Sequence, residues 1–264
     1  MGAVEQICED LAAEHAALDA VVADLDETGW ATPTPAAGWD VKDTILHIHA
    51  ADGMALLAVK DPAAFEDAKV ALLGGASLDG WFVDAATTSG AEVLARWRAD
   101  REGMLAAFRP LGPKDRVPWF GPSMSALSFA TARLMETWAH GHDVATALGR
   151  ELPVTDRLRH VCHIGVTTRG WSYVNRGETV PEGDVRLELV APSGQTWTWG
   201  PDGAGSTVSG TALEFALVAT QRRHLSDTAL LVEGELARDW LDRAQAFAGA
   251  ATNTDPAREG LTVG

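Results

Sequence analysis

The sequence predicts an α+β protein in which a four-helix bundle over residues 1–150 precedes a small α+β domain over residues 151–250. In the first half, apolar residues recur three or four positions apart over four long segments, which is the periodicity of amphipathic helices. After Gly149 the pattern changes to short alternating runs typical of strands, such as VRLELVAP at 185–192. Residues 251–264 carry neither pattern, and we expect them to form a flexible tail.

Clear interruptions separate the helices that we expect in the first half. Asp40 is a favourable N-cap for the second long helix, and Asp43 stands in its first turn, where the helix dipole favours a carboxylate. The proline-rich stretch RPLGPKDRVPWFGP cannot be regular. We expect long helices over residues 3–27, 40–59, 91–108 and 123–148, the last capped by Ser123, and a shorter helix over 62–73.

The second half combines strands and helices in the order expected of a small α+β domain. The pair Ser193-Gly194 predicts a tight hairpin between two alternating runs, at 185–192 and 195–200. We expect helices over residues 155–172, 211–223 and 235–249, and a further strand over 228–234.

Charge and composition disfavour several classes of function. The net charge of −16 opposes binding to the phosphate backbones of nucleic acids and to anionic membranes. No stretch approaches the roughly 18 continuous apolar residues of a membrane span. The two cysteines, Cys8 and Cys162, belong to no CxxC pair, which suits a reducing cytoplasm and predicts a buried free thiol at Cys162. We therefore expect a cytoplasmic protein with a small-molecule substrate and without nucleic-acid or membrane partners, and we leave homodimerisation open.

The strongest local pattern is RLMETWAHGHD at 133–143. Glu136 and His140 are four residues apart and therefore share one helix face, with Asp143 three residues further along roughly the same face. A carboxylate and an imidazole on one inward helix face are metal ligands in helical bundles. The spacing alone is more typical of a solvated surface pair, so it does not by itself establish a metal site.

Two segments resemble the motifs of a known family. GWDVKDTILHIHAAD at 38–52 resembles the opening motif of the DinB-like, mycothiol-dependent maleylpyruvate isomerase family, in which the ninth residue after the Gly is a histidine ligand; here it is His47. RLMETWAHGHDVATALG at 133–149 resembles the second motif, and Glu136 and His140 stand at its ligand positions. Residues 206–249 are similar to the sterol-carrier-protein-like C-terminal domain of one branch of the family.

The resemblance implies a metal-dependent enzyme that uses the thiol cofactor mycothiol. The implied activity is that of an isomerase or S-transferase acting on a small electrophilic metabolite, with zinc preferred as the metal over iron or nickel. Asp143 is expected to orient His140 through its second ring nitrogen. Because an arginine of the C-terminal domain contributes to the isomerase site, Arg222 or Arg223 is expected to hold an anionic group. The alternative for these arginines is that they complement the C-terminus of a helix.

Three alternative functions stay open at the level of sequence. The same site could bind water rather than a thiol, which would make the chain a metal-dependent hydrolase. In a non-enzymatic ligand-binding or regulatory protein, a structural zinc would need four protein ligands, with Asp143 or His142 as the fourth. The third alternative is a metal-free scaffold that retains the motif.

Overall fold

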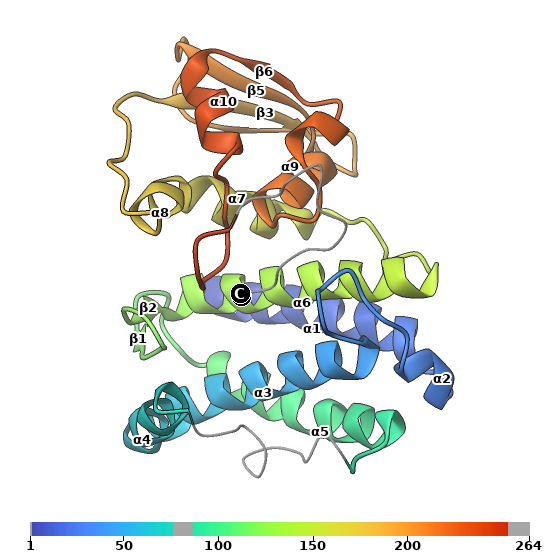
Figure 1. Ribbon diagram of the computed structural model, residues 1–264. Helices are drawn as coiled ribbons and strands as arrows, with labels where there is room; N and C mark the ends of the chain where they lie inside the picture. The colour runs from blue at the N-terminus through green and yellow to red at the C-terminus, as the bar shows by residue number, and fades with distance from the viewer. Residues whose placement is uncertain (1, 76–86, 253–264) are drawn as a thin grey trace. The chain divides into compact units, whose positions relative to one another are not determined.

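A computed structural model describes residues 2–75 and 87–252, and the chain divides into two compact units, Met1–Leu152 and Pro153–Gly264 (Figure 1). The boundary expected from the sequence is residue 150. Of the expected tail, 251–264, all but the first two residues lie outside the described part of the chain. The first unit is helical and the second contains a four-stranded sheet, so the predicted α+β class is confirmed.

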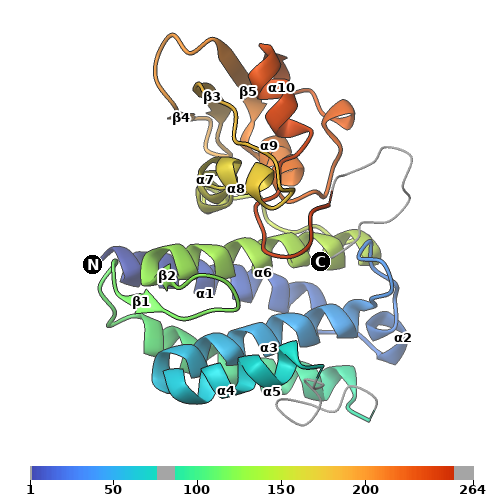
Figure 2. The ribbon, with the colours of Figure 1, turned by 60° about the vertical axis from the view of Figure 1, so that its left-hand side comes forward.

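The first unit is a helical bundle. Its described elements are α1 (Ala3–Val22), α2 (Glu27–Trp30), α3 (Val41–Lys60), α4 (Pro62–Leu73), α5 (Gly90–Phe108), β1 (Arg116–Val117), β2 (Met124–Ser125) and α6 (Ala126–Leu148). Helix α1 lies beside α6 and α3 lies beside α5, as two views show (Figure 1 and Figure 2). Helix α3 also packs on α6, and α1 packs on α5. The four long helices therefore form a closed ring of neighbours around one core.

Each long helix of the bundle contributes large apolar side chains to this core. Leu18, Ile45, Trp97 and Val144, one from each long helix, belong to a single buried cluster and are at most 1% exposed. Burying a large apolar side chain contributes about 1.5–3 kcal/mol to the free energy of folding. Among the described helices, none has both the length and the apolar character required to cross a membrane.

The end of the first helix differs from the prediction. Helix α1 ends at Val22 rather than at residue 27, and a separate short helix, α2, follows it. Asp26 causes the interruption, because its carboxylate accepts a hydrogen bond of 2.8 Å from the backbone N–H of Gly29. This is the geometry of an N-cap, whose residue has an extended backbone rather than a helical one. A chain that caps a new helix at Asp26 cannot also continue the old one.

The start of the last bundle helix also differs from the prediction. Ser125, rather than Ser123, is its N-cap, and the Oγ atom of Ser125 accepts a hydrogen bond of 3.1 Å from the backbone N–H of Ser128. The two residues before the helix, Met124–Ser125, pair in antiparallel fashion with Arg116–Val117. Part of the proline-rich stretch is therefore a short ladder, although the sequence predicted irregular structure throughout.

The second unit is a sheet with helices packed against it. Its described elements are α7 (Leu158–Thr167), α8 (Arg169–Val174), β3 (Val185–Val190), β4 (Thr196–Trp199), β5 (Ser206–Thr211), α9 (Ala212–Ala219), the 3-10 helix η1 (Leu225–Asp227), β6 (Leu231–Glu233) and α10 (Glu235–Leu241). The strand order is β4-β3-β5-β6, with β3 and β5 parallel and the other pairs antiparallel. Gly194, with φ of 85°, makes the turn between β3 and β4 where the sequence predicted a hairpin. Helix α9 packs on β3 and β5, and α7 packs on α9.

Helices of the second unit are shorter than the sequence predicted. The stretch expected as one helix over 155–172 forms α7 and most of α8, which are divided at Thr168. At this division the backbone N–H of Thr168, at 2.9 Å, and its hydroxyl, at 2.7 Å, both donate to the carbonyl of Ile164. The helix expected over 235–249 ends at Leu241.

Candidate metal centre

Three side chains singled out by the sequence converge between α3 and α6. Oε2 of Glu136 lies 3.4 Å from Nε2 of His140 and 4.0 Å from Nε2 of His47. One ligand atom from each of the three residues lies within 4.8 Å of the other two. The structure therefore brings the expected ligand set together, and the binding of an ion by this set stays a prediction.

Local sequence determines where each of these side chains stands on its helix. Asp40 and Asp43 form a reciprocal capping box: the Asp40 carboxylate accepts from the Asp43 N–H at 2.8 Å, and the Asp43 carboxylate accepts from the Asp40 N–H at 3.2 Å. His47 follows seven residues after this cap, which is about two helical turns. On α6, Glu136 and His140 are separated by one turn and point to the same side.

The indole ring of Trp39 packs against the rings of His47 and His140. Its ring centroid lies 4.9 Å from that of His47 and 5.8 Å from that of His140, nearly parallel to the second ring. The backbone around Trp39 is held by a bond from the N–H of Thr34 to its carbonyl, at 2.9 Å, and by a bond from its own N–H to the carbonyl of Ala36, at 3.0 Å. Trp39 belongs to the motif at 38–52, but the sequence alone did not indicate that it lies at the site.

Asp143 stands behind His140, where the sequence analysis expected it. Its Oδ2 atom lies 3.2 Å from Nδ1 of His140, and both side chains are almost completely buried. A carboxylate beside Nδ1 favours the tautomer that carries the proton there, which leaves the lone pair of Nε2 available. Nε2 is the nitrogen that faces Glu136. The effect of Asp143 on ion binding stays a prediction.

The two neighbouring histidines of the same motifs make other contacts. Nε2 of His49 lies 2.7 Å from Oδ2 of Asp100, on the neighbouring helix α5. The ring of His142 stacks on Trp138 at a centroid distance of 5.9 Å. Neither histidine belongs to the converging group of His47, Glu136 and His140.

The ionisation of the candidate ligands suits a cation. Burial, opposed in part by the hydrogen bond and charge of Glu136, lowers the pKa of His47, so its imidazole is neutral at pH 7. Burial is also the largest single influence on Glu136 and raises its pKa, but the hydrogen bonds and charges of His140 and His47 together hold the pKa well below its usual value. The set at pH 7 therefore offers an imidazole lone pair from His47 and one negative carboxylate.

A buried polar cluster that the sequence analysis missed lies in the same bundle. Asp52, which is 1% exposed, accepts hydrogen bonds of 3.1 Å from Nε1 of Trp97 and from Nε of Arg133. Nε2 of His15 lies 3.3 Å from Oδ2 of Asp52, an ion-pair distance without the alignment of a hydrogen bond. Burial, the largest influence, raises the pKa of Asp52, but the Arg133 charge, His15 and Trp97 outweigh it and hold the pKa far below its usual range. We name these four residues the Asp52 cluster.

The two arginines expected to hold an anionic group lie in the second unit. Helix α9 ends at Ala219 rather than at residue 223, because Gln221 has a left-handed φ of 59° that a continuing helix does not contain. Arg222 and Arg223 therefore follow the helix instead of ending it. Nη1 of Arg222 donates a 2.7 Å hydrogen bond to the carbonyl of Thr220, which favours the alternative that this arginine complements the helix C-terminus. Contact of either arginine with a substrate stays a prediction.

Comparison with known proteins gives a match over the residues of this centre. Residues 11–145 match the sequence model of the family described as mycothiol maleylpyruvate isomerase N-terminal domain. Two uncharacterized proteins of Mycobacterium tuberculosis, one from strain CDC 1551 / Oshkosh and one from strain ATCC 25618 / H37Rv, are each 46% identical to the chain over 244 residues. Each alignment covers 91% of this chain and 94% of the relative.

Solved structures show the same fold. The crystal structure of the mycothiol-dependent maleylpyruvate isomerase gives a TM-score of 0.54, and that of a mutant of the same enzyme gives 0.53. Both are 17% identical to this chain, and the alignments cover 87% of this chain and 92% of the other. At this identity the likeness concerns the fold alone, whereas the family match extends over half of the sequence. The chain belongs to the mycothiol maleylpyruvate isomerase N-terminal domain family.

Proposed function

We propose that this chain is a metal-dependent, mycothiol-using isomerase or S-transferase that acts on a small electrophilic metabolite. The observation that carries the proposal is the convergence of His47, Glu136 and His140 within 4.8 Å of one another. The family match supports mycothiol as the thiol, because the description of the matched family names a mycothiol maleylpyruvate isomerase. The reaction type and the metabolite belong to the proposal.

The donor set fits a divalent transition metal. Two atoms that both lie about 2.1 Å from one ion are at most about 4.2 Å apart. The distances from Oε2 of Glu136 to the two Nε2 atoms, 3.4 and 4.0 Å, satisfy this limit, and the ligand atoms of the two histidines lie within 4.8 Å of each other. Two imidazoles and a carboxylate suit zinc first, and the same set also suits iron or nickel. His47, Glu136 and His140 would hold the ion.

Three protein ligands are typical of a catalytic site, which leaves a coordination position for an external group. Asp143 lies at Nδ1 of His140, and His142 stacks on Trp138, so neither of the two residues considered as a fourth ligand faces the group. The side chain of His47 keeps 34% of its surface exposed, so the group can be reached from solvent. This arrangement favours a catalytic over a structural role.

A bound divalent ion would supply an electrophilic centre that lowers the pKa of a coordinated thiol or water. The protein's own residues prepare that centre. The neutral imidazole of His47 presents a lone pair without first losing a proton at pH 7, and Glu136 contributes one negative charge. Asp143 directs Nε2 of His140 toward the same point. The Trp39 ring packs against both imidazole rings.

Metal analysis of purified protein tests the first half of the proposal. We expect about one equivalent of metal in the wild type and loss of that metal in His47→Ala and His140→Ala. The matched controls are His49→Ala and His142→Ala, which remove neighbouring histidines that lie outside the group. Wild-type protein without metal after reconstitution, or ligand variants that retain it, would overturn the metal centre.

Turnover with and without mycothiol tests the second half. With maleylpyruvate as the probe substrate, we expect isomerisation only when both metal and mycothiol are present. Thiol-independent hydrolysis of activated esters at a rate that depends on the metal would instead identify a hydrolase. The proposed role of Arg222 or Arg223, to hold an anionic group of the substrate, rests on the family resemblance, and each Arg→Ala variant should raise KM if it is correct.

A further inference from the structure

Four polar residues, one from each long helix of the bundle, form a buried cluster around the carboxylate of one of them, Asp52. Asp52 on α3 binds Arg133 on α6 through Oδ1 and Trp97 on α5 through Oδ2, and it faces His15 on α1. All four residues are at most 4% exposed. The Asp52 cluster is therefore a buried polar junction to which all four long helices of the bundle contribute.

The strongest link of this junction joins the two helices that carry the candidate metal ligands. Asp52 lies five residues after His47 on α3, and Arg133 lies three residues before Glu136 on α6. At about 1.5 Å of rise per residue, the link lies about 7.5 Å along α3 from one ligand and about 4.5 Å along α6 from the next. Because Arg133, Glu136 and His140 are at i, i+3 and i+7, they also share one face of α6.

The geometry of this link is directional. Nε of Arg133 donates to Oδ1 of Asp52 at 3.1 Å, and Nη2 lies 3.1 Å from the same oxygen. The second carboxylate oxygen is occupied by the indole N–H of Trp97 at 3.1 Å. An apolar helix interface tolerates small sliding and rotation, whereas a buried ion pair with hydrogen bonds on both oxygens has one register.

Stability alone does not explain such a junction. Replacing a buried ion pair by apolar side chains of similar volume is often neutral or stabilising, because burial of the two charges opposes their attraction. A buried polar cluster is better attested as a device that selects one packing arrangement over its neighbours. In this bundle the arrangement concerned is the packing of α3 on α6, because this packing sets the distance of His47 from Glu136 and His140.

We propose that Asp52 and Arg133 are positioning residues of the metal centre, which fix α3 against α6 and thereby set the affinity and the coordination geometry of the ion. This inference rests on the proposed function, because it requires that the three ligands bind a metal. Among the described contacts, Asp52 and Arg133 share no hydrogen bond or ion pair with the three ligands, and Arg133 acts on His47 through its charge.

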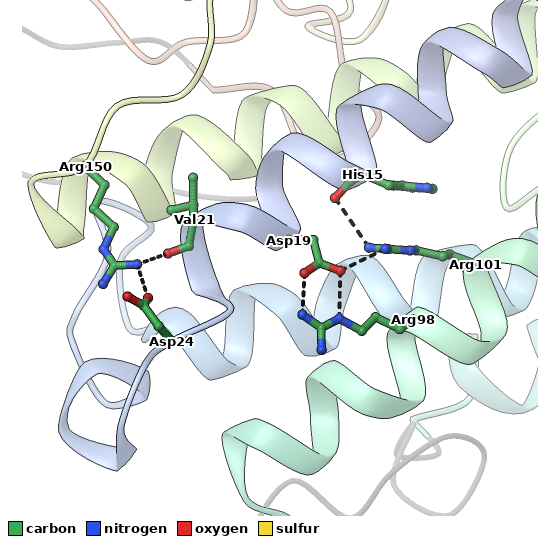
Figure 3. Close-up of polar contacts among 7 residues, drawn as sticks. All are labelled: His15, Asp19, Val21, Asp24, Arg98, Arg101 and Arg150. Carbon is green, nitrogen blue, oxygen red and sulfur yellow. Dashed lines mark hydrogen bonds and ion pairs between the residues drawn. The ribbon is translucent and has the colours of Figure 1, made fainter.

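The test compares this link with a second ion-pair link in the same bundle. Asp19 on α1 pairs with Arg98 and Arg101 on α5, at 2.8 Å from Nε of Arg98 and 2.8 Å from Nη2 of Arg101 (Figure 3). Neither α1 nor α5 carries a candidate metal ligand. Asp19→Asn therefore weakens an inter-helix ion pair outside the interface of α3 and α6, and it is the control for Asp52→Asn. Because Arg101 also stacks on Trp97 and donates to the backbone carbonyl of His15, this control perturbs the edge of the Asp52 cluster and leaves its link between α3 and α6 in place.

Two readouts report on the site rather than on turnover. The dissociation constant for Zn²⁺ is measured by competition with a chromophoric chelator, and the ligand geometry is read from the visible absorption of the Co²⁺-substituted protein. We expect Asp52→Asn and Arg133→Lys to weaken Zn²⁺ binding by on the order of tenfold and to change the Co²⁺ spectrum. Asp19→Asn should keep both at wild-type values, although its thermal unfolding temperature falls.

A double variant covers the case in which a single substitution prevents folding. Asp52→Leu combined with Arg133→Met removes both charges together, so it leaves neither partner as an unpaired buried charge. We expect this variant to fold, as judged by circular dichroism, and to bind Zn²⁺ more weakly than the wild type. A folded double variant with the wild-type dissociation constant and Co²⁺ spectrum would refute the positioning role and leave the metal centre intact. A wild type that binds neither ion would refute the proposed function itself.

Discussion

Replacement of Asp143 by Ala isolates the contribution of the hydrogen bond behind His140. The wild-type contact joins Oδ2 of Asp143 to Nδ1 of His140 at 3.2 Å, with both side chains at most 2% exposed. Without the carboxylate, the imidazole loses its bias toward the tautomer whose Nε2 is free, and Nδ1 loses a buried partner. Loss of such a partner typically reduces metal affinity 10- to 100-fold, which corresponds to about 1.4 to 2.8 kcal/mol.

Chelator competition, with urea unfolding of the metal-free protein beside it, measures this effect. Asp143→Asn keeps an oxygen acceptor for Nδ1 but removes the charge, so its affinity should fall between those of the wild type and Asp143→Ala. The neighbouring His142 stacks on Trp138, and His142→Ala should leave the affinity unchanged. Equal Zn²⁺ dissociation constants for the wild type and Asp143→Ala would refute the reasoning, as would an equally large loss in His142→Ala.

Three further predictions concern other parts of the chain. A Cβ atom at Gly90 would lie 2.1 to 2.4 Å from ring atoms of Trp30. Gly90→Ala should therefore lower the free energy of unfolding, measured by urea titration, by about 1–3 kcal/mol. Gly121→Ala, which has open space around its Cβ, should leave this free energy unchanged. The folded-state pKa of Asp52 lies below its ordinary value of 3.8, so the unfolded chain takes up the proton first as the pH falls. The stability that this carboxylate contributes is therefore present above about pH 4 and is lost as the pH falls further. The free energy of unfolding of Asp52→Asn should depend less steeply on pH over that range than that of the wild type. Burial raises the pKa of Cys162, and its Sγ bonds to a backbone carbonyl at 3.4 Å, so the folded protein should resist alkylation at this thiol until it is denatured.

The long helices of the bundle could be predicted because their signals are local. Asp40 and Asp43 lie within four residues of sequence, and the structure has the expected N-cap at Asp40, to which Asp43 adds a reciprocal capping box. The errors arose where several local signals compete. Ser123 and Ser125 are both acceptable caps, and the choice depends on the pairing of Met124–Ser125 with a strand eight residues upstream. A helical pattern cannot reveal such a pairing.

The residues of the site also differ in whether local sequence alone could predict where they lie. Glu136 and His140 share a face by helix geometry alone, so their proximity follows from sequence spacing. His47 comes from a different helix, and only the family motif could place it beside them. Asp52 lies within that motif, yet nothing in its sequence surroundings indicates partners 45 and 81 residues away. Contacts of this kind are decided by tertiary packing, which periodicity does not encode.

Because two of the three candidate ligands lie on α6 and the third on α3, the geometry of the metal centre depends on how these helices pack. Two ligands on one helix turn keep their separation as long as α6 is helical, whereas the distance from His47 to Glu136, 4.0 Å, depends on how α3 packs on α6. A shift of 1 Å between the helices would therefore leave Glu136 and His140 unchanged and would move the third ligand relative to both. Zn²⁺–ligand bonds tolerate only a few tenths of an ångström. The buried ion pair of Asp52 and Arg133 lies at this interface, where a fixed packing of α3 on α6 would hold the third ligand in range.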